Sequence, residues 1–464
     1  MPQIAQRLVF LKRRFNGLLP MARIPSEILI KIFQIACQPD DSGYKQAVTP
    51  LFIGSICSLW RDVAWSTPLL WNTILLDFSL QYRDTHFQLL GDWLLKARSA
   101  PLSIKLTTKF ECGYLGSFET IMQILLTRSD YWLTFDSLLP TSPHRLFKNT
   151  NLPMLTSVYL HPYKQVRHFG ARYLPVTECL DALRLSPNLQ ECRFEYVCSP
   201  NSFIVSKTTM LHAQLKHLHV MLNQAGSMSL FDSITLPSLS NLRIQHFGTE
   251  KLRLSSITSL FLRSACNLER FSIEFRFDDA DLIACLKTIP SLAYLLLEIS
   301  RIDMGLTRHF VESLDPLISW RRLLLPNLKH FRYKGPVLCD CRPIVDMLAH
   351  RWYLSDSPAG GSPPPQRISK VLKLRVAEVL SSVRYHITRC ARRSNTSGTS
   401  ASRSIFRLSK LRQAEVLNTN RYHITADVQE ELRSLSEEGM LVRIESLIPA
   451  TTVPTPVSPG GVHS

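Results

Sequence analysis

The side chains best suited to chemistry in this chain are its histidines and cysteines. Three histidines, His212, His217 and His219, form a cluster. His217 and His219 are two residues apart, so they share one face of a strand that ends at Val220. They have no carboxylate or cysteine beside them, and strand histidines of this kind are far more often partly covered polar residues than metal ligands.

The eleven cysteines are scattered, and none stands in a recognisable nucleophile context. Cys339 and Cys341 are the closest pair, but no second pair has the spacing of a zinc site. With no CxxC and no secretory leader, the thiols are expected to be reduced and buried, in a cytoplasmic or nuclear protein. We therefore expect no metal and no other cofactor.

Catalytic motifs are absent from the sequence. Neither the Gly-x-Ser-x-Gly nucleophile elbow, nor His-Glu-x-x-His, nor a glycine-rich phosphate loop occurs. The chain is thus expected not to be an enzyme, and its function must depend on binding.

Residues 24–74 carry the pattern that predicts binding, because three helical segments are packed into them. Apolar residues recur at helical spacing in the first: Ile28, Leu29, Ile32, Phe33 and Ile35. The second has an unbroken apolar face: Ile53, Ile56, Cys57, Trp60, Val63 and Ala64. The third begins with Ser66-Thr67-Pro68, a cap followed by a first-turn proline. A domain of about 50 residues is marginal alone, so its remaining apolar surface needs the rest of the chain or a partner.

At these positions the chain resembles the F-box family. Ile24-Pro25-x-Glu27-Ile28-Leu29 stands where the family has Leu-Pro-x-Glu-Leu-Leu. Cys57-Ser58-Leu59-Trp60-Arg61 matches Cys-Lys-x-Trp-Arg, and Thr67-Pro68-Leu69-Leu70-Trp71 matches Ser-Pro-x-Leu-Trp. The gap between the first two segments, 39–50, is longer, as in fungal members of the family. The alternative is an ordinary buried three-helix subdomain.

The resemblance implies that this segment binds a Skp-type adaptor, which bridges to a cullin. The implied adaptor-binding residues are Ile24, Pro25, Ile28, Leu29, Ile32, Phe33, Ile56, Cys57, Trp60, Pro68, Leu70 and Trp71.

From about residue 150 the chain repeats a unit in which an anchor residue precedes a short apolar strand. The anchors are Leu155, Leu189, Leu215, Leu239, Ile257, Leu268, Leu292 and Leu328. The strands are predicted at 158–160, 192–194, 218–220, 242–244, 260–262, 271–273, 295–297 and 331–333. Helical stretches lie between several units, at 176–185, 278–289 and 310–320. Such units stack into one continuous core, and they resemble the degenerate leucine-rich repeats that follow fungal F-boxes. The alternative is an irregular α/β domain with leucine-rich strands.

The net charge of +17 lies almost entirely outside the expected folded body. Residues 1–23 contribute +5 and residues 366–412 contribute +11, which leaves about +1 for the rest. Without a nucleic-acid-binding motif, we interpret these segments as solvated basic flanks. Nucleic acid is therefore not expected as a partner. No apolar run is long enough to predict a membrane span, so a membrane is not expected as a partner either.

A segment near the C-terminus is duplicated, since 374–388 recurs as 411–425. Only the second copy continues into a predicted helix and strand. The fold class is therefore α/β, a three-helix F-box followed by an irregular leucine-rich-repeat solenoid. The expected parts are a basic N-terminal segment (1–23), the F-box (24–74), a linking and capping region (75–150), the solenoid (151–350), a disordered basic insertion with a partial duplication (351–410), a closing unit (411–448) and a disordered tail (449–464).

The function that the resemblance implies is substrate recognition in an SCF-type ubiquitin ligase, with a protein target of unknown identity bound by the repeats. The alternatives are a scaffold with no role in ubiquitylation and a nucleic-acid binder that acts through its basic flanks. Strand positions between the apolar ones are the candidate target-binding residues: Arg193, His219, Arg243, Ser272 and Arg332. Their three arginines give a mild preference for an acidic or phosphorylated target.

Overall fold

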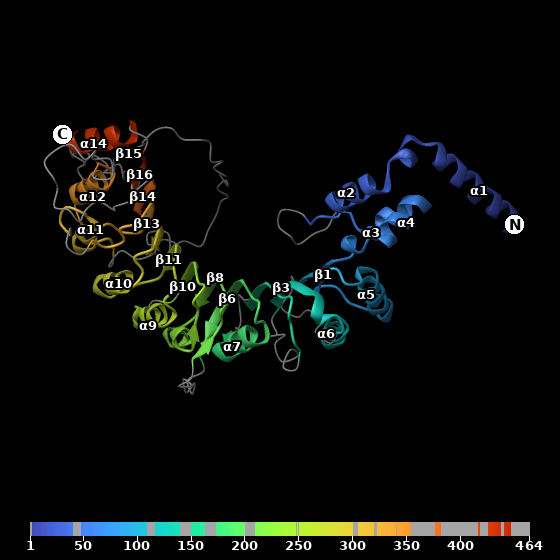
Figure 1. Cartoon of the computed structure of the whole chain (residues 1–464), viewed down its shortest axis with the longest axis horizontal. Helices are drawn as coiled ribbons and strands as arrows, with labels where there is room; N and C mark the ends of the chain where they lie inside the picture. Colours follow the sequence, from blue (N-terminus) through green and yellow to red (C-terminus); the bar gives the residue numbers. More distant parts are fainter. Residues whose placement is uncertain are drawn as a thin grey trace, which may run out of the picture. The chain divides into compact units, whose positions relative to one another are not determined.

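The computed structural model describes residues 2–39, 48–108, 117–139, 150–162, 173–199, 209–246, 248, 250–299, 305–319, 323–339, 341–353, 376–381, 416–417, 426–437 and 440–446. The chain forms two compact units, Met1–Leu239 and Ser240–Ser464. Each is mixed α/β, with parallel strands and with connecting helices along one face of the sheet (Figure 1).

The first unit begins with helices: α1 (Pro2–Leu18), η1 (Pro20–Arg23), α2 (Ser26–Ala36), α3 (Pro50–Ile56), α4 (Ser58–Ser66) and η2 (Pro68–Leu70). The single helix predicted over 53–64 is in fact two, because Cys57 is extended (φ −155°, ψ 170°) and its Sγ accepts a hydrogen bond from the Trp60 amide at 3.5 Å. The break lets α4 pack back on α3, where a Cβ at Gly54 would overlap the Trp65 ring.

The rest of the first unit is built mainly from these longer strands and helices: β1 (Thr73–Asp77), α5 (Asp84–Ala97), β2 (Leu102–Thr107), α6 (Phe118–Leu126), β3 (Trp132–Leu139), β4 (Ser157–Pro162), α7 (Val176–Leu185), β6 (Glu191–Cys198) and β8 (His217–Leu222). Shorter elements lie among them: β5 (Leu174–Pro175), β7 (Met210–Leu211), α8 (Ser229–Asp232) and β9 (Ile234–Thr235). The strands pair in parallel in the order β1-β2-β3-β4-β6-β8. Residues 75–150, expected to link and cap, thus supply β2, β3 and most of β1 to the same ladder as β4.

The second unit continues the alternation: β10 (Asn241–His246), α9 (Ser255–Ser264), β11 (Arg270–Glu274), α10 (Asp279–Leu286), β12 (Tyr294–Glu298), α11 (Arg308–Leu314), β13 (His330–Lys334), α12 (Cys341–Tyr353), β14 (Val376–Ser381), β15 (Val416–Leu417), α14 (Ala426–Glu437) and β16 (Leu441–Ser446). Its strands are parallel, in the order β10-β11-β12-β13-β14-β16-β15. Among the described residues, no helix has the length and apolar character needed to cross a membrane.

A repeated turn precedes the strands. The amide of the anchor leucine donates to the carbonyl three residues earlier, at 3.1–3.2 Å, in five units: Leu155, Leu189, Leu239, Leu292 and Leu328. In two of these turns an asparagine, Asn188 or Asn327, donates to a proline carbonyl of the preceding unit at 2.8 or 3.0 Å. The anchors are fully or almost fully buried, so each turn fixes the start of one strand against the core.

The unit predicted around Ile257 is wrong. Residues 260–262 are not a strand but part of α9, in which Ile257, Leu260 and Phe261 are buried while Leu262 is 67% exposed. The spacing i, i+3, i+4 fits a helix as well as the repeat.

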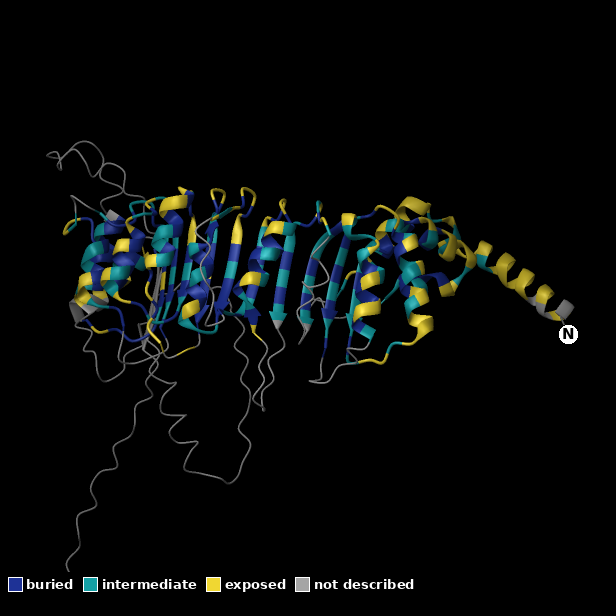
Figure 2. Cartoon of the chain, turned by 90° about the horizontal axis from the view of Figure 1, so that it is seen from below, coloured by how far each residue is buried: buried dark blue, intermediate teal, exposed yellow. Residues whose placement is uncertain are grey.

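Within the part of the chain that the structure describes, helices cover each ladder on one face only (Figure 1). Burial alternates along the strands (Figure 2): Leu242 and Ile244 of β10 are fully buried, whereas Arg243 between them is exposed. A parallel sheet covered on both faces would bury both sets of side chains. The uncovered side is called the open face below.

The C-terminal region differs from the expected disordered insertion at 351–410. Helix α12 reaches Tyr353, and residues 376–381 of the first duplicated copy form β14, which pairs with both β13 and β16. A Val-Ala-Glu-Val-Leu run suits a strand, and pairing covers an otherwise open edge. Residues 354–375, most of 382–425 and the tail 449–464 lie outside the described residues, so disorder there stays a prediction.

Candidate protein-interaction surfaces

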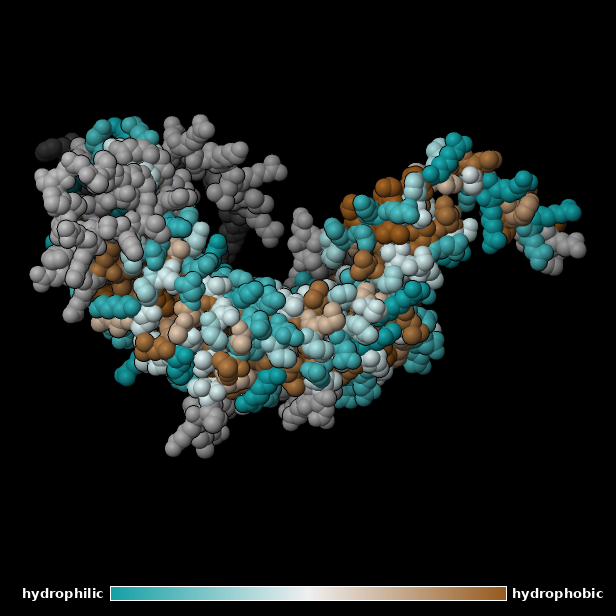
Figure 3. All heavy atoms as spheres, in the orientation of Figure 1, coloured by the Kyte–Doolittle hydropathy of each residue, from teal (hydrophilic) through white to brown (hydrophobic). Residues whose placement is uncertain are grey.

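Large apolar side chains are exposed on the helices that follow α1. We call this set the apolar ridge: Ile28, Ile32 and Ile35 of α2, Phe52 and Ile56 of α3, Leu59 of α4 and Leu69 of η2. The exposed fractions of Ile35 and Phe52 are 70% and 59%. Figure 3 shows hydrophobic residues gathered over this part of the chain. Isolated exposed apolar residues are ordinary, but a cluster of them marks an interaction surface.

Helix α2 is apolar on two sides. Leu29 and Phe33, four residues apart, are buried, each 1% exposed. Ile28, Ile32 and Ile35, spaced by four and three residues, lie on the adjacent side and remain exposed. A helix with so wide an apolar surface is normally covered on both sides, so α2 has the composition of a helix that packs between its own domain and a partner.

Trp71 fixes these helices to the strand ladder. Its ring is 1% exposed, and its Nε1 donates to the Ala64 carbonyl of α4 at 2.8 Å. The Trp93 Nε1 of α5 donates to the Trp71 carbonyl at 2.7 Å. The rings of Trp65 and Trp93 meet Trp71 edge-on, at 5.3 and 4.9 Å between centroids. This tryptophan cluster therefore holds the helices that carry the apolar ridge in a fixed position on the first strands.

The structure divides the twelve predicted adaptor-binding residues into two groups. Four are core residues: Leu29, Phe33, Leu70 and Trp71. The others are accessible, with Pro25, Ile28, Ile32 and Ile56 exposed and Ile24, Cys57, Trp60 and Pro68 half-buried. Trp60 packs on Phe33, with 5.0 Å between the ring centroids. Four ridge residues were not among the predicted adaptor-binding residues: Ile35, Phe52, Leu59 and Leu69. Their apolar character was the signal in the sequence that could have identified them.

The candidate target-binding residues lie on the open face in matched registers. In the first unit Arg193 of β6 is opposite His219 of β8. In the second unit Arg243 is opposite Ser272, which is opposite Leu296, which is opposite Arg332. Each set therefore forms part of one row across its ladder.

Two of the three arginines in these rows, Arg193 and Arg243, already have carboxylate partners within the chain. The Arg193 Nη2 lies 2.6 Å from Glu195, and the Arg243 Nε and Nη2 lie 2.7 and 2.6 Å from Glu274. Arg332 also interacts with other groups of the chain. An acidic target would have to displace or share these contacts, which weakens the preference for such a target.

The first unit carries further charge pairs on the open face. Lys105 contacts Asp136 at 3.2 Å, and His161 lies 3.7 Å from Asp136 and 3.0 Å from Glu195. Burial alone would raise the pKa of Glu195, but the His161 hydrogen bond and the Arg193 charge outweigh it and hold that pKa below its ordinary value. The positive and negative side chains of this group are therefore nearly equal in number.

The second unit carries a stack of planar groups on the open face of its own ladder. The guanidinium of Arg270 lies 4.2 Å from the centroid of the Tyr294 ring, which stacks on His330 at 4.2 Å and 7°. These three residues occupy one register across β11, β12 and β13. Planar groups of this kind bury area at little cost in side-chain entropy.

Four of the described cysteines are buried thiols with raised pKa values. Burial raises the pKa of Cys37 to about 11 and of Cys285 to about 12, and it raises the pKa of Cys179 and Cys192 as well. These thiols therefore stay protonated and are poor nucleophiles.

Within the described residues, no three His, Cys, Asp or Glu side chains gather as a metal site, and the Cys341 side chain is outside that set. His212 is buried and bonds the Ser186 carbonyl at 2.9 Å through Nε2, while His217 and His219 lie on one face of β8, as predicted.

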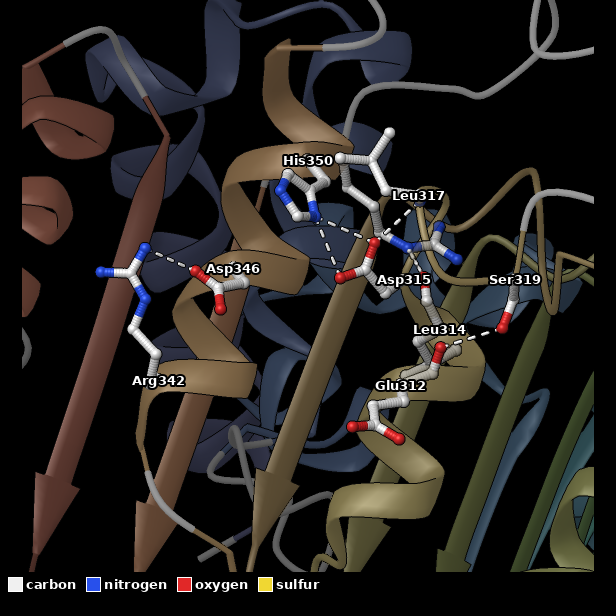
Figure 4. Close-up of polar contacts among 9 residues, drawn as sticks. Glu312, Leu314, Asp315, Leu317, Ser319, Arg342, Asp346 and His350 are labelled. Carbon is white, nitrogen blue, oxygen red and sulfur yellow. Dashed lines mark hydrogen bonds and ion pairs between the residues drawn. The ribbon is translucent and has the colours of Figure 1, made fainter. Parts of the chain in front are cut away.

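A buried polar cluster joins α11 to α12 in the second unit (Figure 4). Arg351 is fully buried and donates to the carbonyls of Leu314, Leu324 and Leu325 at 2.7, 2.7 and 3.1 Å. Burial lowers the pKa of Arg351 to about 10, although nearby Asp315 opposes that shift. Both Asp315 oxygens lie 2.9 Å from His350 Nδ1. All of these groups satisfy one another, so the cluster is structural.

No protein-family model matches the chain, and neither does a curated protein. Among solved structures the chain is similar to a crystal structure of a protein from Bacteroides fragilis, with 14% identity and a TM-score of 0.30, covering 56% of this chain and 67% of that one. A TM-score this low establishes neither a shared fold nor a shared function.

Proposed function

We propose that this chain is an F-box protein that serves as the substrate-recognition subunit of an SCF-type ubiquitin ligase. The observation that carries the proposal is the apolar ridge. It lies on α2, α3, α4 and η2, the segment whose residues resemble the F-box, and it leaves seven large apolar side chains exposed. A Skp-type adaptor is the partner that the resemblance assigns to this segment, and a cullin would bind through that adaptor.

The two groups of predicted residues take different roles in this proposal. Ile28, Ile32 and Ile56 would contact the adaptor directly, together with Ile35 and Phe52. The buried residues would hold α2 and α4 in position and make no contact themselves. Binding energy at such interfaces concentrates in a few large central side chains, and α2 supplies three of them at successive turns.

The strand ladders would form the target-binding part. The repeated turn, the buried anchor leucines and the parallel strands support a degenerate leucine-rich-repeat interpretation. The open face of the first unit offers Arg193 and His219 in one register, and that of the second unit offers Arg243, Ser272 and Arg332 in another. Stacked strands within a unit let a target contact several of them at once. Because Arg193 and Arg243 are paired to carboxylates, a target with both charges fits this face better than a purely acidic one.

Ubiquitin transfer would be positional, since the sequence places no cysteine in a recognisable nucleophile context. The receptor would bring its target close to the ubiquitin-carrying enzyme and so raise their effective concentration. The proposed location is the cytoplasm or the nucleus, where a cullin complex and reduced cysteines are both expected.

Affinity purification of the full chain tests the proposal directly. The expected result is recovery of a Skp-type adaptor together with a cullin. Recovery of the adaptor without a cullin would instead support a scaffold with no role in ubiquitylation. Absence of both, from a folded protein, would contradict the F-box proposal itself.

Target capture can be tested separately from adaptor capture. Combined charge reversal, Arg193→Glu, Arg243→Glu and Arg332→Glu, should abolish target capture and leave adaptor capture unchanged. The matched control is Arg184→Glu and Arg263→Glu, in helices α7 and α9 on the covered side of the ladders. Equal target capture by both variants would place the target site elsewhere.

A further inference from the structure

Helix α1 presents a second exposed apolar surface, separate from the ridge. Ile4, Leu11, Phe15 and Leu18 are 72%, 61%, 65% and 74% exposed. At 100° per residue their spacings of seven, four and three place them within an arc of about 60°. They therefore form one stripe along the helix, with no side chain of the described residues covering it.

Outside the stripe, Val9 and Phe10 are also exposed, at 49% and 59%. The other described side chains there are mostly polar, and all of the charges on α1 are positive. Arg7 and Arg14 flank the stripe on one side and Lys12 on the other, while Arg13 lies opposite. All four are exposed. The first acidic residue of the chain is Glu27, beyond the helix. The stripe thus has cations along both edges and no carboxylate to neutralise them.

We propose that α1 binds the surface of a membrane that contains anionic phospholipid. The stripe would enter the boundary between headgroups and acyl chains, and Arg7, Lys12 and Arg14 would lie at the level of the lipid phosphates. An apolar face bearing Phe and Leu with a Lys/Arg-rich polar face is the composition of helices that lie in this interface. The inference goes beyond ligase function and revises the expectation that a membrane has no part.

The combination of features favours lipid over the other polyanions. Nucleic acid would use the four cations but would leave Ile4, Leu11, Phe15 and Leu18 in water. A protein groove could cover the stripe, but the cations along both edges would then each need an acidic partner in a fixed position. A lipid surface satisfies both requirements without fixed positions, since anionic headgroups surround the helix on both sides.

Vesicle co-sedimentation of the full chain tests this inference. With phosphatidylcholine vesicles in which about one lipid in three is phosphatidylserine, at least about tenfold more protein should sediment than with phosphatidylcholine alone. Added salt should reduce the difference, because it screens the cations. The combined variant Leu11→Ser and Phe15→Ser should lose about tenfold of the bound fraction.

Val9→Ser is the matched control. Val9 is 49% exposed but lies on the opposite side of α1, so its loss should leave sedimentation unchanged. Three results would overturn the inference: equal sedimentation with the two vesicle types, wild-type sedimentation by the stripe variant, or no sedimentation. Binding of purified calmodulin, an acidic protein that binds basic amphipathic helices, without vesicle binding would assign α1 to a protein groove and also overturn it. Adaptor capture should be the same in all these variants, which separates this test from that of the ligase proposal.

Discussion

The apolar ridge and the open face of each ladder are both uncovered, but they differ in what their side chains contact. The ridge side chains are apolar and exposed to water, whereas charged side chains on the open face are paired with one another. On the ridge, Ile35 and Phe52 expose most of their apolar surface to water. On the open face, Arg193 and Arg243 are paired with Glu195 and Glu274. The ridge therefore gains free energy from being covered, whereas the open face is already stable in water.

This difference separates the two kinds of recognition. A partner that covers the ridge gains mainly from burial of apolar area, about 25 cal/mol per Å² before the costs of association. A partner on the open face must replace existing ion pairs, so its specificity depends on matching a charge pattern. The ridge therefore suits a partner that is the same in every complex, and the open face suits a partner that is selected by its charge pattern.

The largest expected effect comes from breaking the support of the ridge. Trp71→Ala removes a fully packed ring and its hydrogen bond to Ala64, so it should lower the free energy of unfolding by about 3–5 kcal/mol. Ile35→Ala on the ridge should change it by less than about 0.5 kcal/mol, because Ile35 is exposed. Urea denaturation of both variants measures the contrast, and similar losses would mean that Ile35 is covered in the free protein.

The next effect compares a buried arginine with an exposed one on the same helix. Arg351→Met leaves three buried carbonyls without their donor and should cost about 3 kcal/mol. Arg342 of α12 pairs with Asp346 at 2.7 Å but is 48% exposed, so Arg342→Met should cost less than about 1 kcal/mol. Equal costs in thermal denaturation would show that water reaches Arg351.

The smallest expected effect concerns acid stability on the open face. The pKa of Glu195 is lowered in the folded chain. Its contribution to stability is therefore complete above the unfolded value, about 4.3, and is lost as pH falls through the folded value. At neutral pH Glu195→Gln should be less stable than wild type by about 1 kcal/mol, and this deficit should shrink below pH about 5.

Urea midpoints measured across that pH range provide the test for Glu195. Asp181→Asn, in an exposed pair on α7, is the control and should change stability little. A Glu195→Gln deficit that stays constant down to pH about 3 would mean that Glu195 keeps an ordinary pKa.

Much of the fold could be predicted from the spacing of apolar residues. Helix α7 and most repeat strands fall where the sequence places them, because a buried anchor leucine precedes each strand. The error at Ile257 has a physical cause, since Leu-x-x-Leu spacing also describes a helical face. The break at Cys57 was missed because the apolar period continues through it, and β14 because its neighbours are rich in loop-forming residues.

The site was less predictable, because periodicity identifies apolar residues but not what covers them. Leu29 and Ile28 are adjacent and chemically alike, yet one is 1% and the other 46% exposed. Likewise, the pairing of Arg243 with Glu274 joins two residues that are 31 positions apart in the sequence, so only the register of β10 and β11 reveals it.

The most direct test of the central claim is a titration of the full chain with a purified Skp-type adaptor. Ile28→Asp combined with Ile32→Asp places two charges on the ridge without touching the core, and Leu262→Asp on α9 is the exposed apolar control. The ridge variant should lose at least about a hundredfold in affinity, which corresponds to roughly 3 kcal/mol, with an unchanged melting temperature, and the control should bind like wild type. Wild-type affinity in the ridge variant would contradict the claim that this surface binds the adaptor.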